Sequence, residues 1–345
     1  MPVPPTPPAA DIPRMTDVVA LAAELLTIDS TSGGEAKAVD FVSRWLVSHG
    51  WNVSLQQISA GRANVWATRA GGGVTLSTHL DTVAPHIPPR LEDGRLFGRG
   101  ACDAKGIVAA MLAAGERLVA SGEERIDLLF VVGEESGSDG ARAANRLPAT
   151  SRFLINGEPT ESRLASGAKG SLRVTLRTEG REAHSAYPHL GKSAIEPLID
   201  LLPTLRSLEL PRDPQLGDTT VNIGVIRGGS AGNVIPAHAE AELMVRLVGD
   251  VAPVREALER WVGDRAEIEY GSHIPAQRFH TVAGFETAPM AYTSDIPLLG
   301  RWGVPLLFGP GSIHVAHTPD EAIDVAELRA SVEVYERLTR TLLAS

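Results

Sequence analysis

The sequence predicts an α/β protein with a mixed, mainly parallel sheet flanked by helices, and an inserted ferredoxin-like α+β domain. Two continuous apolar runs, residues 126–132 and 153–155, are separated by residues of helical character. Such runs are typical of strands buried on both faces of a parallel sheet. Residues 170–272 then follow the order strand, helix, strand, strand, helix, strand, which is the ferredoxin-like split unit. A buried-type strand and a long helix come after it, so the first domain is expected to resume.

The elements before residue 160 follow from periodicity and turn residues. Apolar residues at helical spacing predict two opening helices, the second ending before Gly50, and Asp93-Gly94 predicts a hairpin turn. Alternating or continuous apolar runs predict the strands. After a proline-rich lead-in at residues 1–13, the expected elements are helices 17–26 and 35–47, strands 51–57, 64–69 and 74–78, hairpin 91–97, helix 104–120, and strands 126–132 and 153–155.

The remaining elements define the domain organisation. The inserted domain, residues 168–273, interrupts a first domain formed by residues 14–167 and 274–345. Its expected elements are strand 171–178, helix 193–208, strands 220–227 and 237–247, helix 251–262 and strand 266–270. Strand 304–308 and helix 321–342 then close the first domain.

Composition restricts the class of protein. The 345 residues carry a net charge of −10, which repels nucleic-acid phosphates and anionic membrane surfaces, so neither is an expected partner. The single cysteine, Cys102, permits no internal disulfide and is interpreted as a small buried residue. The most apolar window, residues 107–114, is too short to span a bilayer, and the N-terminus lacks the pattern of a secretory signal. We therefore expect a cytoplasmic protein.

Candidate ligands follow the predicted strands at the points where the strands end. His79 and Asp81 follow the strand ending at residue 78, and further candidates follow the later strands. The carboxyl ends of strands in open α/β sheets form the binding crevice, so these side chains are expected at one edge. The other members of this set are Asp103, Glu134, Glu135, Glu158 and His317.

Each candidate also has a simpler interpretation when it is taken alone. The Glu134-Glu135 pair is usually a solvated turn, Glu158 could be a turn residue, and Asp103 could cap the helix that follows it. Their common placement at one sheet edge is what favours a site.

Imidazole and several carboxylates without thiolate suit zinc, manganese or cobalt. Five ligands from this set of candidates are more than the three protein ligands that one catalytic zinc usually takes, so two metal ions are expected. A pair of ions lowers the pKa of a bound water and polarises a substrate carbonyl. One carboxylate must then stay uncoordinated to carry the proton.

Seven ordered motifs carry a family resemblance: STHLDTV, GRGACDAKG, VVGEESGSDG, NGEPT, HSAYP, GNVIP and AHTPDE. In this order and spacing the chain resembles the family of co-catalytic metallohydrolases that includes acetylornithine deacetylase and succinyl-diaminopimelate desuccinylase. Glutamate carboxypeptidase, aminoacylases and carnosinase-type dipeptidases belong to the same family. The resemblance extends from about the first helix to the last.

The resemblance assigns roles to the residues of the first domain. It implies that His79 and Glu158 hold one metal, that Glu135 and His317 hold the other, and that Asp103 bridges them. Asp81 would orient the His79 imidazole. Glu134 would be the general base, and successive side chains leaving a strand end are expected to point to opposite sides, Glu135 to the metal and Glu134 to the substrate.

The resemblance also assigns roles to the inserted domain, which would be a lid and the surface of a homodimer. His184 would stabilise the oxyanion, commonly in the partner's active site, and Asn233 and Arg246 would bind the substrate's carbonyl region and carboxylate. Taken alone, His184 is a loop histidine and Arg246 a solvated strand end.

The resulting hypothesis is a zinc-dependent dimetal amidohydrolase, with cobalt or manganese as alternative ions. It would remove the acyl group from a small N-acyl amino acid, as acetylornithine deacetylase does. The alternative enzyme is a dipeptidase or carboxypeptidase with a dipeptide-like substrate. The alternative from another class is a binding or scaffolding protein with structural metals, and an uncoordinated Glu134 argues against it.

Overall fold

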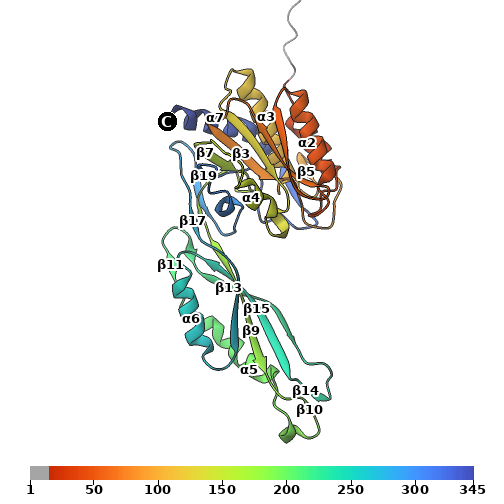
Figure 1. The fold of residues 1–345 in the computed structure, drawn as a ribbon, viewed down its shortest axis with the longest axis vertical. Helices are drawn as coiled ribbons and strands as arrows, with labels where there is room; N and C mark the ends of the chain where they lie inside the picture. Colours follow the sequence, from red (N-terminus) through yellow and green to blue (C-terminus); the bar gives the residue numbers. More distant parts are fainter. Residues whose placement is uncertain (1–14) are drawn as a thin grey trace, which may run out of the picture. The chain divides into compact units, whose positions relative to one another are not determined.

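The computed structural model describes residues 15–345, so the expected lead-in at residues 1–13 lies outside the described part. The described chain divides into two units (Figure 1). Unit 1 comprises residues 15–162, 301–304 and 308–345, and unit 2 comprises residues 163–300 and 305–307. Unit 2 is therefore longer at both ends than the predicted insertion, residues 168–273.

Unit 1 is built on a mixed sheet with the order β1-β2-β6-β3-β7-β19, in which the last strand crosses the boundary of the unit because its residues 305–307 are assigned to unit 2. The central strands β6, β3 and β7 are parallel, whereas β1 and β2 extend the sheet in antiparallel fashion. All residues of β3 and β6 are buried, and the apolar run at residues 126–132 predicts this burial for β6. The α/β class is thereby confirmed. The strands are β1 (Asn52–Ser59), β2 (Arg62–Thr68), β3 (Val74–His79), β6 (Ile126–Val131), β7 (Phe153–Asn156) and β19 (Val304–Leu307).

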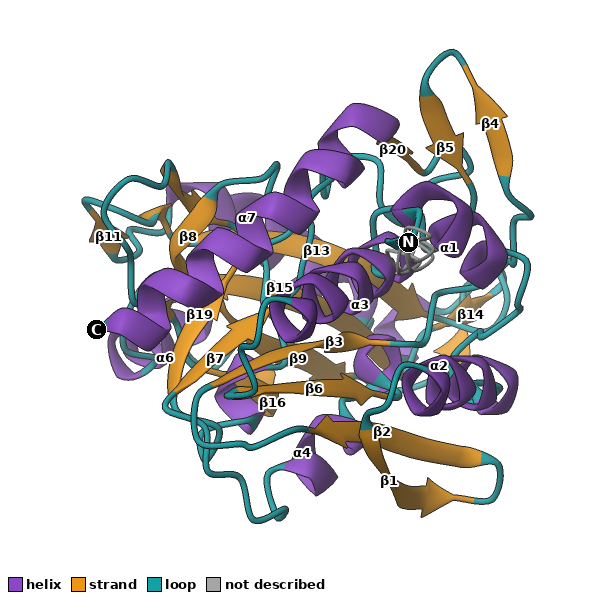
Figure 2. Cartoon of the chain, turned by 90° about the horizontal axis from the view of Figure 1, so that it is seen from above, coloured by secondary structure: helices purple, strands orange, loops and turns teal. Residues whose placement is uncertain are grey.

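Helices cover both faces of this sheet. Figure 2 shows α3 and α7 on one side and α4 on the other. Helix α1 begins where its Asp17 carboxylate accepts a hydrogen bond from the Val19 amide, and helix α3 is buried along most of its length. The helices of unit 1 are α1 (Val18–Leu26), α2 (Ala36–Ser48), α3 (Lys105–Ala120), α4 (Asp139–Ala144) and α7 (Val325–Ala344), with the 3-10 turn η1 (Glu134–Ser136).

The last helix begins later than the sequence predicts. Strand β20 (Ala322–Asp324) occupies the start of the expected helix 321–342 and pairs with β5 (Arg95–Phe97), the second strand of the hairpin formed with β4 (Arg90–Glu92). Asp324 then caps α7, because its carboxylate accepts from the amides of Ala326 and Glu327. Long-range strand pairing overrides local helical periodicity here.

Unit 2 contains a four-stranded antiparallel sheet with the order β13-β15-β9-β16. Its chain order is strand, helix, strand, strand, helix, strand, as predicted for residues 170–272. One face of the sheet packs on two helices around a leucine-rich core. The elements are β9 (Gly170–Glu179), α5 (Ile195–Leu201), β13 (Thr220–Gly228), β15 (His238–Leu247), α6 (Ala252–Val262) and β16 (Glu267–Ile274).

The expected helix 193–208 is only partly α-helical. It continues from α5 into the 3-10 helix η3 (Leu202–Ser207), in which Pro203 has no N–H to donate to the preceding turn. The sequence also missed three small sheets of unit 2. Their strands are β17 (Gln277–Arg278), β8 (Leu164–Ala168) and β18 (Thr287–Met290); β10 (Ala183–His184) and β14 (Val234–Ile235); and β11 (Arg212–Asp213) and β12 (Gly217–Asp218). The 3-10 turns η2 (Pro188–Leu190) and η4 (Ile296–Leu298) complete the unit.

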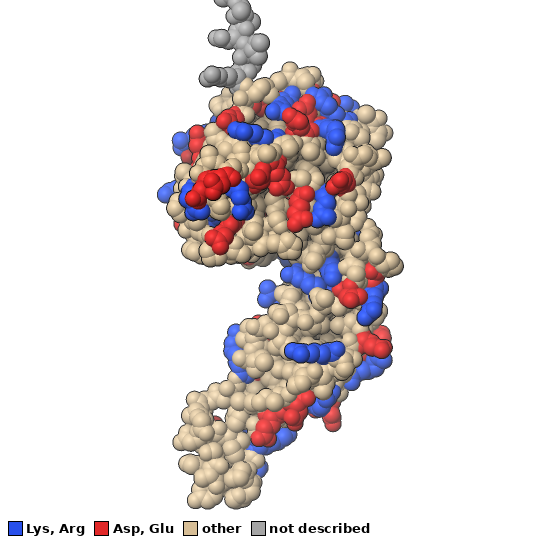
Figure 3. Space-filling model, turned by 180° about the vertical axis from the view of Figure 1, so that it is seen from behind, with Lys and Arg blue, Asp and Glu red and all other residues tan. Residues whose placement is uncertain are grey.

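Two observations concern the surface. None of the helices in residues 15–345 combines the length and the apolar character needed to cross a bilayer. Figure 3 shows acidic and basic side chains interspersed on the visible face of each unit, without a continuous basic surface there.

Candidate metal centre

The predicted ligands of the first domain all lie in unit 1, at or after the carboxyl ends of its strands. His79 is the last residue of β3, Glu135 lies in η1 after β6, and Glu158 follows β7 by two residues. Because β3, β6 and β7 are parallel, these ends lie at one edge of the sheet. Asp103 precedes α3, and His317 lies in the loop before β20.

Asp103 joins the two predicted histidines through different oxygen atoms. His79 Nε2 lies 2.9 Å from Asp103 Oδ1, and His317 Nε2 lies 3.2 Å from Asp103 Oδ2. The same His317 nitrogen is 2.7 Å from Glu135 Oε1. The ligand atoms of His79, Asp103 and Glu135 all lie within 4.8 Å of one another. A carboxylate with one imidazole on each oxygen has the arrangement expected of a bridging ligand between two ions.

Asp103 does not act as the cap that its position also allowed. The N-cap residue of α3 is Ala104, and no side chain accepts a hydrogen bond there. Asp103 is 5% exposed, so its carboxylate is held at the histidines and away from bulk water.

The electrostatics of the cluster indicate where positive charge is stabilised. Burial by itself would lower the pKa of His79, but Asp103 and Asp81 outweigh it and raise that pKa well above the ordinary value. Hydrogen bonds to Asp103 and Glu135 raise the pKa of His317 to about 10. Burial would raise the pKa of Asp103, yet the two histidines lower it. The carboxylates thus favour cationic imidazoles, and divalent cations would supply the same positive charge with neutral imidazoles as ligands. The donor set fits such ions.

Glu158 lies close to this charge centre and is 5% exposed. Its negative charge contributes to the raised pKa of His79. A side chain at residue 309 would collide with the carbonyl oxygen of Glu158, so Gly309 permits the loop after β19 to pack directly on the loop after β7.

Asp81 organises the residues around it. Its backbone oxygen lies 2.9 Å from His79 Nδ1, whereas its carboxylate is 3.6 Å from that nitrogen. The carboxylate instead accepts hydrogen bonds from the Glu134 and Glu135 amides at 3.0 and 3.1 Å, and from the Ser32 hydroxyl at 2.7 Å. Asp81 therefore fixes both the imidazole of His79 and the turn that carries the glutamates.

The two glutamates do not leave a strand end as the sequence argument assumes. They lie in the 3-10 turn η1, after Gly133 adopts a φ of 75°. Successive side chains in such a turn are separated by about 120° rather than by the 180° of a strand. The three-residue cluster of potential ligands contains Glu135 and not Glu134.

The three predicted residues of the inserted domain lie in unit 2. Two of them are brought together there, since β10 pairs with β14 and the Ser185 amide, next to His184, donates to the carbonyl of Asn233 at 2.9 Å. Arg246 lies on β15, and both its burial and the charge of Arg173 lower its pKa. Within residues 15–345 no hydrogen bond or ion pair of the Arg246 guanidinium is found.

Sequence reasoning missed Ser32, Arg99 and Glu321 as partners of the site. Glu321 is part of the AHTPDE motif, but nothing in the local pattern indicates that its carboxylate returns to the Asp103 segment. Cys102 is buried as expected, and burial raises the pKa of its thiol, so it is not a reactive nucleophile.

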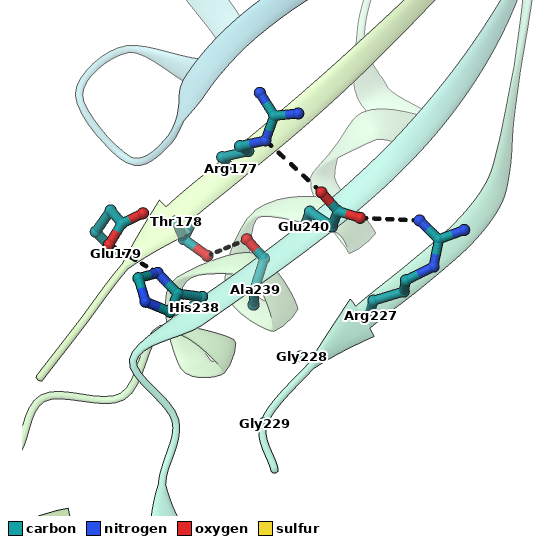
Figure 4. Close-up of a pocket in the computed structure, with 9 residues that line it drawn as sticks. All are labelled: Arg177, Thr178, Glu179, Arg227, Gly228, Gly229, His238, Ala239 and Glu240. Atoms are coloured by element: carbon teal, nitrogen blue, oxygen red, sulfur yellow. Dashed lines mark hydrogen bonds and ion pairs between the residues drawn. The ribbon is translucent and has the colours of Figure 1, made fainter. Parts of the chain in front are cut away.

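A separate cavity in unit 2 contains none of the predicted site residues (Figure 4). Its arginines and carboxylates are paired, since Arg227 lies 2.8 Å and Arg177 lies 3.6 Å from Glu240, and the His238 ring lies 2.9 Å from Glu179. Because these charges are already paired on an exposed sheet surface, this cavity is not a competing candidate for the active site.

Comparisons with known proteins identify a matching peptidase family and several similar proteins. The model of peptidase family M20/M25/M40 matches residues 75–341. A peptidase M20 domain-containing protein of Schizosaccharomyces pombe is 37% identical over 340 residues, which cover 95% of this chain and 85% of the relative. A probable carboxypeptidase of Aspergillus clavatus is 37% identical over 397 residues, which cover 98% of this chain and 87% of the relative. The structure of a dinuclear metal-binding M20 peptidase from Bacillus subtilis matches with a TM-score of 0.74 and 17% identity, covering 97% of this chain and all of that one.

Proposed function

Since the chain belongs to peptidase family M20/M25/M40, we propose that it is a two-metal hydrolase that cleaves an amide bond adjacent to a free carboxylate. The observation that carries the proposal is the Asp103 carboxylate, with His79 on one oxygen and His317 on the other. His79 and Glu158 would hold one ion, Glu135 and His317 the other, and Asp103 both. The dinuclear peptidase from Bacillus subtilis supports two ions. Zinc is proposed, with cobalt or manganese as alternatives.

The proposed mechanism gives each residue of the site a separate role. Two ions held by these residues would lower the pKa of a bound water and would polarise the scissile carbonyl. The Glu134 carboxylate accepts the water proton and returns it to the leaving amine nitrogen. Asp81 supports this step because its carboxylate holds the amide of Glu134 and thereby the position of that side chain. His184 stabilises the oxyanion, and Asn233 binds the carbonyl region of the substrate.

Arg246 is the proposed carboxylate ligand. Its guanidinium is partly buried next to Arg173, which lowers its pKa and makes an anionic ligand favourable. A substrate carboxylate would form a bidentate pair with the guanidinium and offset both unfavourable contributions.

Carboxypeptidase or dipeptidase activity is the first candidate within this reaction class. The expectation of acetylornithine-type deacetylation rests on sequence motifs alone, whereas the relative from Aspergillus clavatus is named a probable carboxypeptidase. A dipeptide and an N-acyl amino acid share the amide and the carboxylate that the proposed residues recognise. They differ in the group on the amino side of the scissile bond.

A substrate panel tests the proposal. Metal-loaded protein is incubated with dipeptides, N-acetylornithine, N-acetylmethionine and C-amidated versions of the same dipeptides, with and without a chelator. We expect chelator-sensitive cleavage of the dipeptides and at least 10²-fold slower cleavage of the amidated ones, because the amidated substrates leave Arg246 unpaired. Cleavage of acetylated amino acids alone would restore the deacetylase assignment. If the protein binds two ions and cleaves none of the substrates in the panel, the enzymatic proposal is refuted.

We also propose a homodimer formed through unit 2. Strand β13 is an edge strand, and its exposed Ile223 and Ile226 line a groove with Ile199 of α5. An edge strand with exposed apolar side chains is favourable for pairing with a second copy. Elsewhere in unit 2, Tyr187 and Leu190 are also exposed near His184, as a segment that reaches a partner subunit requires. Ile226→Glu should shift the sedimentation coefficient to that of a monomer, and an unchanged dimer would exclude this surface.

A further inference from the structure

Glu321 is a buried carboxylate that accepts hydrogen bonds from the backbone amides of the Asp103 segment. It is 1% exposed, and its Oε1 accepts hydrogen bonds from the amides of Gly100, Cys102 and Asp103 at 2.9, 3.3 and 3.2 Å. The bond to Asp103 joins residues that are 218 positions apart in the chain. A single oxygen atom thus holds the three amides that surround the bridging residue.

The other oxygen of Glu321 leads to the His317 segment. Arg99 is 2% exposed, and its Nη1 donates to Glu321 Oε2 at 2.7 Å and to the carbonyl of Thr318 at 3.2 Å. Thr318 directly follows His317, which has a φ of 64° and therefore a backbone conformation that side chains disfavour. The buried pair of Glu321 and Arg99 therefore contacts the amide of Asp103 and the carbonyl of Thr318, which is the residue after His317.

We infer that Glu321 and Arg99 are positioning residues that set the spacing between Asp103 and His317. This inference rests on the proposed two-metal site, because it gives the pair a purpose beyond stability. Neither side chain touches the ligand atoms, so both act through backbone. The distance that they control is the 3.2 Å contact between Asp103 Oδ2 and His317 Nε2.

Glu321→Gln tests the role with little change of volume. The amide has one nitrogen donor, which must face either the Arg99 guanidinium or the three backbone amides, so one set of hydrogen bonds is lost. Changes in groups that support metal ligands commonly reduce metal affinity by about 10–100-fold. We expect that reduction for the ion held by His317 and Asp103.

A matched control is available in the same unit. Glu35 is also fully buried and pairs with an arginine, Arg62, at 3.0 Å, but its hydrogen bonds do not involve the Asp103 or His317 segments. Metal-free wild type, Glu321→Gln and Glu35→Gln are titrated with Co²⁺, and the d–d absorption reports stoichiometry, affinity and coordination. Unfolding free energies of the metal-free proteins are measured in parallel.

The inference predicts weakened binding of one Co²⁺ equivalent and an altered d–d spectrum in Glu321→Gln, while Glu35→Gln keeps the wild-type titration. The effect of Glu321→Gln should disappear in an Asp103→Asn background, because the carboxylate that it positions is then absent. If Glu321→Gln does not fold, Arg99→Lys replaces it, since lysine keeps the charge but cannot span Glu321 and Thr318 in the same way.

Two results would overturn the inference: wild-type affinity for both ions in Glu321→Gln, or equal losses in Glu321→Gln and Glu35→Gln. Hydrolysis is measured on the same wild-type sample. A wild type that binds two ions without cleaving any substrate refutes the proposed function, whereas the comparison of affinities decides the positioning role separately.

Discussion

Asp127→Asn should stabilise the protein at neutral pH and change the pH dependence of its stability. Asp127 lies in β6, is 3% exposed, and its Oδ1 atom has no hydrogen-bond partner within the described residues. Burial raises its pKa from 3.8 to about 6, although a hydrogen bond from the Arg69 amide partly opposes the shift. The native state therefore favours the protonated carboxyl, and asparagine resembles this neutral form.

The magnitude follows from the size of the pKa shift. The folded state holds the Asp127 proton more tightly than the unfolded state does, so the contribution of Asp127 to stability is fully present below pH 4 and is lost as the pH rises through 6. At about 1.4 kcal/mol per pKa unit, a shift of about two units costs about 3 kcal/mol above pH 6. Asp127→Asn removes this cost. We expect a gain of about 2–3 kcal/mol at pH 7.5 and a difference close to zero at pH 4.

Urea unfolding of the metal-free proteins, followed by tryptophan fluorescence between pH 4 and pH 8, measures this difference. Asp264→Asn is a suitable control because Asp264 is exposed in unit 2, and its substitution should change stability by less than about 0.5 kcal/mol. Parallel pH profiles for wild type and Asp127→Asn would refute the reasoning, as would a variant that is less stable than wild type at pH 7.5.

Further predictions concern the proposed site. Glu134→Gln should lower kcat by at least about 10²–10⁴-fold and leave metal content unchanged by elemental analysis; surviving activity would mean that the base is another residue. Asp103→Asn should lose at least one of two bound ions in equilibrium dialysis, and full occupancy would exclude a bridging role. Arg246→Ala should raise KM for carboxylate substrates far more than for C-amidated ones, and an equal effect on both would rule out a carboxylate contact. His184→Ala mixed with Glu134→Gln should regain some activity if His184 acts across a dimer, whereas no recovery would indicate action within one subunit.

The sequence predicts those parts of the fold that depend on local chemistry. The buried strands β6 and β7 follow from the apolar runs at residues 126–132 and 153–155, the hairpin β4–β5 from Asp93-Gly94, and the start of α1 from Asp17. Strand β8 lacks such a signal because its sequence, LASGA, is short and composed mostly of small residues. It becomes a strand by pairing with β18, more than a hundred residues later, and no local pattern contains that information.

The candidate site also contains some residues that the sequence predicts and others that it does not. His79, Asp103, Glu135 and His317 stand out because they follow strands or precede a helix, and the structure brings their ligand atoms together. Glu321 gives no comparable signal, because its contribution depends on the backbone amides of a segment that lies far away in the sequence. Supporting residues of this kind become visible only once the loops are placed.

The division of unit 1 into segments on either side of unit 2 has a consequence for biosynthesis. A ribosome that has completed residue 162 has delivered His79, Asp103 and Glu135, but neither His317 nor helix α7, whose buried Tyr335 and Leu338 complete the packing of that unit. Nearly all of unit 2 is a continuous stretch and emerges before the last segment of unit 1. The nascent chain can therefore fold its second unit first, and the residues of the candidate metal centre come together only after the C-terminal residues have been added.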